Sequence, residues 1–234
     1  MARALLTTAL DRIDPAEREW TGKIESRRGE LLEERALTSP VFDSGAPGPK
    51  GDLGVLHEPV PVEVASILMS QPTLWCVLLM RLVRELRPSS CLELGTAFGI
   101  SGAYQAAALE LNGEGSLTTL EGAREWADIA EQGFSELGLA RVETLVGPIE
   151  QTFAAAADSG PFDYVFVDAE HSEQAIRSYF HLMTPHLSSG AVVVFDDIDW
   201  SEGAWRSWHA VRRHERVARS ASLGRMGVAI IGAA

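Results

Sequence analysis

The sequence predicts an α/β protein with a doubly wound, mostly parallel sheet of seven strands that is covered by helices on both faces. From Pro88 onward, short apolar runs alternate with amphipathic helical segments, which is the pattern of repeated strand–helix units. The apolar runs are nearly uninterrupted, as in parallel strands that are buried on both faces. The last two runs are separated only by a short turn around Gly224 and Arg225, so they are expected to form an antiparallel hairpin.

The first part of the chain is expected to be a helical arm followed by a loop. Residues 1 to about 40 are polar and helix-prone, and Asp14 followed by Pro15 is typical of a helix N-cap and first helical residue. Glycines at positions 45, 48, 51 and 54 imitate a collagen repeat, but the period does not continue, so the stretch is interpreted as a flexible loop. We therefore expect an N-terminal arm over 1–60, placed where a mobile lid would lie, and a main domain over 61–234.

The main domain is expected to begin with a helical stretch over 62–86 and to continue as alternating strands and helices. The predicted strands cover residues 90–95, 115–121, 141–147, 162–168, 190–196, 216–222 and 226–232. The helices between the first five strands are expected to start near Ile100, Arg124, Ile149 and Ser172, and a further helix is expected over about 201–214. Ligands bind such sheets beyond the carboxyl ends of the strands, so the candidate site residues are sought there.

Composition limits the classes of partner and location. The net charge of −13 repels phosphate backbones, so no nucleic-acid partner is expected. The apolar run over 74–80 is far too short to span a membrane. Cys76 and Cys91 lack the spacing of metal ligands and are interpreted as buried free thiols of a reducing compartment. The N-terminus has no clear cleavage site, which favours a cytoplasmic protein, with a signal peptide as the alternative.

A glycine-rich turn is expected to follow the first strand of the sheet. It reads Glu93-Leu94-Gly95-Thr96-Ala97-Phe98-Gly99-Ile100-Ser101, and a glycine at position 95 lets a ligand approach the backbone. The second strand ends at Glu121, about 26 residues after Gly95, where nucleotide-binding sheets place an acid on the ribose hydroxyls. The alternative is that Glu121 caps the next helix. The Gly-x-x-x-Gly spacing lacks the pattern that cradles a pyrophosphate, which favours a ribose-containing cofactor without phosphates over NAD.

Several stretches of the main domain resemble one enzyme family. CLELGTAFGIS resembles the first motif of the class I S-adenosylmethionine-dependent methyltransferases, of the catechol and caffeoyl-CoA O-methyltransferase type. TLEGAREWADIAEQGFSELGL, VGP, FDYVFVDAEH and VVVFDDIDW are similar to the segments that contain the family's second to fifth strands. The similarity covers roughly residues 65–232, and it implies a Rossmann-like methyltransferase fold with the strand order 3-2-1-4-5-7-6.

The resemblance also implies a site for S-adenosyl-L-methionine. The glycine-rich turn would hold the methionine part, Glu121 would bind the ribose hydroxyls, and Pro148 and Ile149 would flank the adenine. The residues implied to bind the cofactor are Glu93, Gly95, Thr96, Gly99, Ser101, Glu121, Pro148, Ile149 and Asp168. The acidic surface does not oppose this cofactor, since it carries a sulfonium cation rather than phosphates.

Carboxylates gather at the ends of the fourth and fifth strands. Asp168 ends the fourth strand, and Asp196 and Asp197 end the fifth. If these strands are neighbours, about 4.8 Å apart, a divalent cation would bridge the acids, and oxygen ligands suit Mg²⁺ or Mn²⁺. Alternatively the acids cap helices: Asp199 or Ser201 could be the N-cap of the helix that begins at Glu202, and Asp199 is the preferred interpretation. Successive strand residues point to opposite faces, so Asp196 and Asp197 converge only if the strand has ended there.

His171 is the candidate general base. Metal-dependent members of the similar family have a lysine at this place and an amide where this chain has Asp197. An imidazole with an unperturbed pKa near 6.5 suits proton abstraction at neutral pH. The competing interpretation is that His171 caps the helix that begins at Ser172. Trp200, which follows the acids, is expected to wall an acceptor pocket, as the similar position does in the family.

These features together predict an S-adenosylmethionine-dependent O-methyltransferase that acts on a hydroxyl of a small molecule. His171 and Asp168 are the predicted catalytic residues, and Asp168, Asp196 and Asp197 are the predicted metal ligands. The acceptor would be a catechol-like diol, a sugar or a natural-product scaffold. The N-terminal arm and the final hairpin would both suit pairing in a homodimer. A metal-independent methyltransferase and a non-catalytic cofactor-binding protein remain as alternatives, and the glycine spacing argues against a dehydrogenase.

Overall fold

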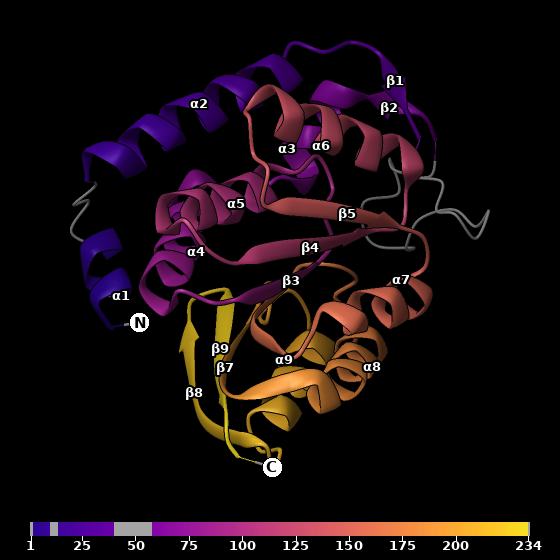
Figure 1. Ribbon diagram of the computed structural model, residues 1–234. Coiled ribbons are helices and arrows are strands. Elements are labelled where there is room, and N and C mark those ends of the chain that lie inside the picture. The colour runs from indigo at the N-terminus through magenta and orange to yellow at the C-terminus, as the bar shows by residue number, and fades with distance from the viewer. Residues whose placement is uncertain (1, 10–13, 40–57, 234) are drawn as a thin grey trace.

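The computed structural model describes residues 2–9, 14–39 and 58–233. A sheet of seven strands in the order β5-β4-β3-β6-β7-β9-β8 lies between two groups of helices (Figure 1). Counted along the chain within this sheet, the order is 3-2-1-4-5-7-6, which confirms the topology that the resemblance implied. The glycine stretch over 45–54 lies outside the described residues, so the mobile lid stays a prediction.

The parallel part of the sheet consists of β3 (Ser90–Leu94), β4 (Ser116–Glu121), β5 (Val142–Val146), β6 (Phe162–Val167) and β7 (Leu187–Phe195). Strands β8 (Val217–Leu223) and β9 (Met226–Ile231) form the predicted antiparallel hairpin, and β9 also pairs antiparallel with β7. The start of β9 therefore lies at the edge of the sheet where the parallel strands end. Each predicted strand is present, and the largest difference is that β7 begins three residues before position 190.

Helices cover both faces of the sheet (Figure 1). The helices on one side are α4 (Thr73–Leu86), α5 (Ile100–Asn112) and α6 (Arg124–Glu136), and those on the other are α7 (Ile149–Ala156), α8 (Glu173–Met183) and α9 (Glu202–Val211). Short 3-10 turns, η2 (Ala157–Ser159) and η3 (Thr184–His186), follow α7 and α8. The stretch predicted as helical over 62–86 is divided, because α3 (Val62–Met69) ends at an extended Ser70 and α4 begins after Pro72. Proline disfavours helical backbone at the residue before it, which here is Gln71.

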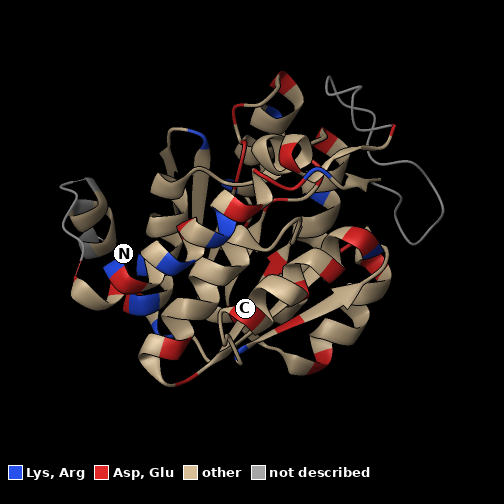
Figure 2. Ribbon diagram, turned by 90° about the horizontal axis from the view of Figure 1, so that it is seen from above, with Lys and Arg blue, Asp and Glu red and all other residues tan. Residues whose placement is uncertain are grey.

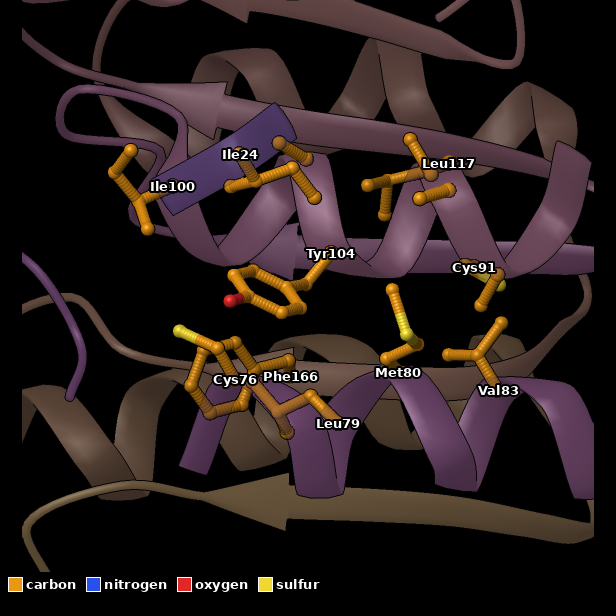
Figure 3. Packing of buried hydrophobic residues seen from close by; sticks show 14 of the residues in the cluster. Ile24, Cys76, Leu79, Met80, Val83, Cys91, Ile100, Tyr104, Leu117 and Phe166 are labelled. Atoms are coloured by element: carbon orange, nitrogen blue, oxygen red, sulfur yellow. The ribbon is translucent and has the colours of Figure 1, made fainter. Parts of the chain in front are cut away.

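Strand residues alternate between two hydrophobic cores. Figure 3 shows Leu79, Met80 and Val83 of α4 directed toward Tyr104 of α5 and Cys91 of β3. The second core lies on the opposite face, under α7, α8 and α9. Both cysteines are buried and free, as predicted.

The alternation of side chains along each strand determines toward which face of the sheet the residues after the strand point. Val194 of β7 and Phe166 of β6 belong to the core on the α4–α5 side. Side chains of a strand alternate with a period of two, so Asp196 and Asp168, two residues further on, are in phase with that side. The linker between α3 and α4 lies on this side as well, and it contacts both acids as described below.

The N-terminal arm packs on the same side of the sheet (Figure 1). It consists of α1 (Ala2–Ala9), α2 (Pro15–Leu31) and a short strand β1 (Leu37–Thr38), which pairs with β2 (Val60–Pro61). Helix α2 begins as predicted, since the Asp14 carboxylate accepts hydrogen bonds from the backbone N–H groups of Ala16 and Glu17, both at 2.9 Å. A buried ion pair fixes the arm to α4, in which Arg81 Nε donates to Glu17 Oε2 at 3.0 Å.

Acidic residues are spread over many elements rather than gathered in a single patch in the view of Figure 2. No single helix among residues 2–9, 14–39 and 58–233 is both long and apolar enough to cross a membrane. The bent pair α3–α4 meets that test only when its two helices are counted together.

Breaking the buried pair should loosen the arm. The substitution Glu17→Gln removes the buried carboxylate that faces the Arg81 guanidinium, so we expect the free energy of unfolding to fall by about 3 kcal/mol in urea denaturation. Glu19→Gln on the same helix is the matched control, because Glu19 pairs with Lys23 in an exposed position. Equal effects of the two substitutions would contradict the structural weight given to the Glu17–Arg81 pair.

Candidate functional site

The glycine-rich turn after β3 is shaped by the neighbouring strand end. Gly95 has a φ of +98°, and a Cβ atom at this position would lie 2.2 Å from the carbonyl oxygen of Asp168. Gly99 also has a positive φ, +79°, and it is the N-cap of α5. From the sequence, the glycine at position 95 is expected because a ligand approaches the backbone there. The structure adds a second reason for a glycine, because a side chain at position 95 would collide with the chain at the end of β6.

The Glu121 carboxylate holds this turn against the end of β4. One of its oxygens accepts a hydrogen bond from the backbone N–H of Ala97 at 2.8 Å, and the other accepts one from Ala123 at 2.9 Å. Burial raises the pKa of Glu121 to about 7, although the hydrogen bonds from backbone N–H groups oppose the shift. The interpretations of Glu121 as a helix cap and as a ribose-binding acid are therefore compatible. The carboxylate accepts a hydrogen bond from Ala123 at the start of α6, and it also lies at the carboxyl edge of the sheet. A carboxylate oxygen accepts more than one hydrogen bond, so acceptor capacity remains for a hydroxyl.

Glu93 lies beneath the turn and is fully buried. Its Oε1 accepts hydrogen bonds from the Ser101 hydroxyl and from the Gln105 amide, both at 2.7 Å, and its Oε2 accepts one from Thr119 at 2.7 Å. Burial raises the pKa of Glu93 to about 7, and these hydrogen bonds oppose the shift. Glu93 and Ser101 thus bond to each other and stabilise the turn from below. Their contact with a cofactor stays a prediction.

The remaining predicted cofactor residues lie around the same edge. Thr96 is buried and its hydroxyl bonds to that of Thr119 at 2.7 Å. Pro148 is the N-cap of α7 and Ile149 its first residue, and the preceding Gly147 donates its N–H to the carbonyl oxygen of Glu121 at 2.9 Å. This bond brings the β5–α7 turn next to Glu121. An open hollow of about 280 Å³ lies between β5 and α7, and its lining residues include Gly147 but neither Glu121 nor Gly95.

The structure brings Asp168 and Asp196 together, because β6 and β7 are adjacent parallel strands in which Val167 pairs with Phe195. A residue that the sequence argument missed joins them. The Gln71 amide nitrogen donates to Asp168 Oδ2 at 2.7 Å and also to Asp196 Oδ2. Burial, followed by repulsion from Asp196, raises the pKa of Asp168 well above its usual range.

Arg225 is the second residue that the sequence argument missed. Its Nε donates to Asp196 Oδ1 at 3.0 Å, its Nη2 donates to Asp196 Oδ2 at 2.7 Å, and Nη2 lies 2.6 Å from Asp197 Oδ1. The Asp196 side chain is 0% exposed, so this carboxylate meets the guanidinium away from water. The predicted hairpin could have indicated this residue. Because its second strand pairs antiparallel with β7, the turn before that strand lies at the edge where the parallel strands end.

Asp197 can point at the same cation because the strand has ended. Strand β7 stops at Phe195, and Asp197 has a φ of +51° in the left-handed region, which aspartate tolerates better than most residues. The condition for convergence of Asp196 and Asp197 is therefore met. Burial and repulsion from Asp196 raise the pKa of Asp197 to about 6, against the opposing attraction of Arg225.

His171 lies beside this acidic group. Its Nε2 is 3.5 Å from Asp197 Oδ2 and 3.8 Å from Asp168 Oδ1, and its ring centroid is 6.4 Å from that of Trp200, a side chain that is 54% exposed. Burial lowers the pKa of His171 below its usual value, although Asp196 opposes the shift. Helix α8 is capped instead by the Ser172 hydroxyl, which accepts a hydrogen bond from Ala175 N–H at 3.1 Å.

The interpretation of Asp199 as a helix cap is wrong. The N-cap of α9 is Ser201, whose hydroxyl accepts a hydrogen bond from the Ala204 N–H at 3.0 Å. Helix α9 begins at Glu202, so the residue directly before it, rather than Asp199, is placed to reach the free N–H groups of the first turn.

The residues present do not fit a divalent cation in this arrangement. Both Asp196 oxygens and one Asp168 oxygen already accept N–H hydrogen bonds from Arg225 or Gln71. A metal ion at these oxygens would face positive N–H hydrogens, from Arg225 at Asp196 Oδ1 and from Gln71 at Asp168 Oδ2. Within the described part of the chain, no group of three or more His, Cys, Asp or Glu side chains is arranged to hold a metal ion. The Mg²⁺ or Mn²⁺ site at Asp168, Asp196 and Asp197 stays a prediction that this geometry does not support.

Comparisons with known proteins agree on the type of domain. An O-methyltransferase of Aspergillus hancockii, hkm8, is 29% identical over 150 residues, which are 62% of this chain and 58% of that protein. A catechol O-methyltransferase of Mycobacterium tuberculosis is 34% identical over 108 residues, which are 46% of this chain and 47% of that protein. The chain thus spans about half the length of the curated relatives it matches.

Solved structures and a family model extend the agreement. The crystal structure of the O-methyltransferase TomG from Streptomyces achromogenes, which is involved in tomaymycin synthesis and was solved with SAM, superimposes with a TM-score of 0.60 at 26% identity. The match covers 70% of this chain and 82% of that one. Residues 92–198, which run from within β3 to just after β7, match the family model of a methyltransferase domain. The resemblance to class I S-adenosylmethionine-dependent O-methyltransferases is thereby confirmed, and residues 92–198 are the part that matches the methyltransferase domain model.

Proposed function

We propose that this chain is an S-adenosylmethionine-dependent O-methyltransferase that moves a methyl group to a hydroxyl of a small molecule. One observation carries the proposal. In a domain of the methyltransferase family, the Glu121 carboxylate is bonded to the glycine-rich turn at the same edge of the sheet where His171 lies beside Asp168 and Asp197. The acid expected to bind the ribose and the residue expected to accept the proton thus lie at the same edge of the sheet.

The residues of the turn fit S-adenosylmethionine. The positive φ of Gly95 leaves the backbone open where a side chain would collide, and Glu121 keeps acceptor capacity for the ribose hydroxyls. Pro148 and Ile149, held beside Glu121 through Gly147, supply the apolar flank expected for the adenine. When bound, the cofactor supplies an activated methyl group on a sulfonium. The chain itself has only to position the acceptor and to remove its proton.

We assign the removal of that proton to His171. Its Nε2 lies 3.5 Å from Asp197, whose carboxylate would stabilise the imidazolium that forms when the acceptor hydroxyl gives up its proton. With S-adenosylmethionine bound, the acceptor oxygen would take the methyl group from the sulfonium as the carbon–sulfur bond breaks, and the proton would remain on His171. Trp200, next to His171, offers an aromatic surface on which the acceptor can pack.

The acceptor is a hydroxylated small molecule, such as a catechol-like diol, a sugar or a natural-product scaffold. A relative is named a catechol O-methyltransferase, and a structural neighbour is involved in tomaymycin synthesis. A cytoplasmic location and homodimer formation through the arm or the final hairpin stay predictions.

Removal of the Glu121 charge should weaken cofactor binding. In Glu121→Gln, an amide NH₂ group replaces one acceptor and faces a backbone N–H, so affinity for S-adenosylmethionine should fall by about 10-fold or more in isothermal titration calorimetry at pH 8. The wild-type affinity should also decline as the pH falls below about 7, because the raised pKa of Glu121 makes the carboxylate take up a proton there. The variant lacks that decline. Glu131→Gln on the exposed face of α6 is the matched control, and an affinity of Glu121→Gln equal to this control would remove Glu121 from the cofactor site.

Loss of His171 should slow the reaction without weakening the cofactor. In His171→Asn, no group of suitable basicity faces the acceptor, so kcat should fall by about 100-fold or more while the Kd for S-adenosylmethionine stays unchanged. The rate is measured by single-turnover methyl transfer to a panel of hydroxylated aromatic acceptors. His181→Asn, at an exposed position in the last turn of α8, is the control for a change from histidine to asparagine outside the site. A kcat equal to that of the control would show that His171 is not the base.

A further inference from the structure

The side chain of Arg225 carries the positive charge that lies beside the acids at the end of β7. The planar guanidinium of Arg225 contacts Asp196 through two nitrogens, at 3.0 Å and 2.7 Å, and reaches Asp197 at 2.6 Å. Such a paired geometry is the strongest way in which arginine binds a carboxylate. Arginine stays protonated in proteins, so a permanent cation faces two acids that would otherwise repel each other.

The backbone fixes the position of Arg225. The residue lies in the turn directly before β9, whose Gly227 pairs with Phe195 of β7. The Ile198 N–H donates to the Arg225 carbonyl oxygen at 2.9 Å, which joins the turn that contains Arg225 to the segment that follows Asp197. The side chain is 29% exposed, so most of it is enclosed. The guanidinium is thus part of the sheet edge rather than a mobile surface group.

Gln71 closes the other side of the acids. Its side-chain amide nitrogen donates to Asp168 and to Asp196, and the backbone carbonyl oxygen of Gln71 accepts a hydrogen bond from Arg28 of α2 at 2.9 Å. Asp196 therefore has N–H donors from two directions. A divalent cation binds carboxylate oxygens by their lone pairs, and here those directions are taken by hydrogen-bond donors.

We propose that Arg225 is the resident counter-ion of this site, that it takes the place a divalent cation would occupy among Asp168, Asp196 and Asp197, and that methyl transfer by this chain needs no metal. The inference rests on the proposed function. Arg225 acts as a positioning residue, since it orients Asp196 and Asp197, and Asp197 in turn lies against His171.

A consequence for the acceptor follows from the chemistry. A metal that chelates two oxygens selects a vicinal diol, whereas a site without metal has no need of a second hydroxyl. It also supplies no Lewis acid, so the hydroxyl must itself be acidic. A phenol, with a pKa near 10 as in tyrosine, meets this requirement, and an alkyl hydroxyl does not. Among the acceptors of the proposed function, the absence of a metal favours a phenol, with or without a neighbouring hydroxyl, over a sugar, and the phenol ring can pack on Trp200.

Metal binding can be measured without any turnover. Full-length protein freed of metal by chelation is titrated with Mn²⁺, and free Mn²⁺ is followed by electron paramagnetic resonance. We expect no saturable binding to the wild type or to Arg219→Ala, a control on the exposed face of β8. We expect Arg225→Ala to gain a saturable site, because its acids have lost their counter-ion. Circular dichroism checks that the variant is folded. Saturable Mn²⁺ binding by the wild type would overturn the proposal, and so would a folded Arg225→Ala that gains no site.

Activity supplies the second arm. The wild type should methylate a simple phenol and the matching catechol at rates that EDTA leaves unchanged, whereas any residual activity of Arg225→Ala should rise on addition of Mg²⁺. A wild-type rate that EDTA abolishes and Mg²⁺ restores would overturn the inference. If Arg225→Ala does not fold, the wild-type titration and the EDTA result decide, and Arg225→Lys, which keeps a point charge, should remain without a Mn²⁺ site. Failure of the proposed function is distinct, since the wild type would then not bind S-adenosylmethionine.

Discussion

Burial of negative charge at one edge of the sheet is the constraint on which the rest of this structure depends. Glu93, Glu121 and three aspartates lie at or under the carboxyl ends of the parallel strands, and removal of each charge from water costs several kcal/mol unless a partner compensates it. The chain compensates them in different ways. Glu93 receives hydroxyl and amide donors, Glu121 receives backbone N–H groups, and the aspartates receive Gln71 and Arg225. These bonds connect the glycine-rich turn, the break between α3 and α4 and the β8–β9 turn to the same edge of the sheet.

Local features of the sequence were sufficient to predict most of the fold. Continuous apolar runs predicted the buried strands, and helical periodicity between them predicted the helices. Both signals are local, because a strand that is buried on both faces needs apolar residues at every position. The acids at the strand ends were equally visible, since they interrupt these runs. Parallel pairing then required Asp168 and Asp196 to lie side by side once β6 and β7 were neighbours.

The partners of the acids could not be predicted in the same way. Gln71 lies in a helix break about a hundred positions before Asp168, and nothing in its own surroundings indicates that its amide reaches the sheet edge. Arg225 looked like an ordinary turn residue, and only the antiparallel pairing of β9 with β7 places it beside Asp196. Asp199 shows the converse limit, because a cap depends on where the helix begins, and Ser201 was two residues nearer to that point.

In the sequence, Gln71 lies before and Arg225 lies after residues 92–198, the segment that matches the methyltransferase domain model. A graft of that segment onto another protein would carry all the acids of the edge, but neither Gln71, whose amide donates to Asp168 and Asp196, nor Arg225, whose charge pairs with Asp196 and Asp197. The segment that matches the domain model therefore does not include the two residues that hold its acids in this structure. A domain with the same acids and other flanking residues would place different groups against them.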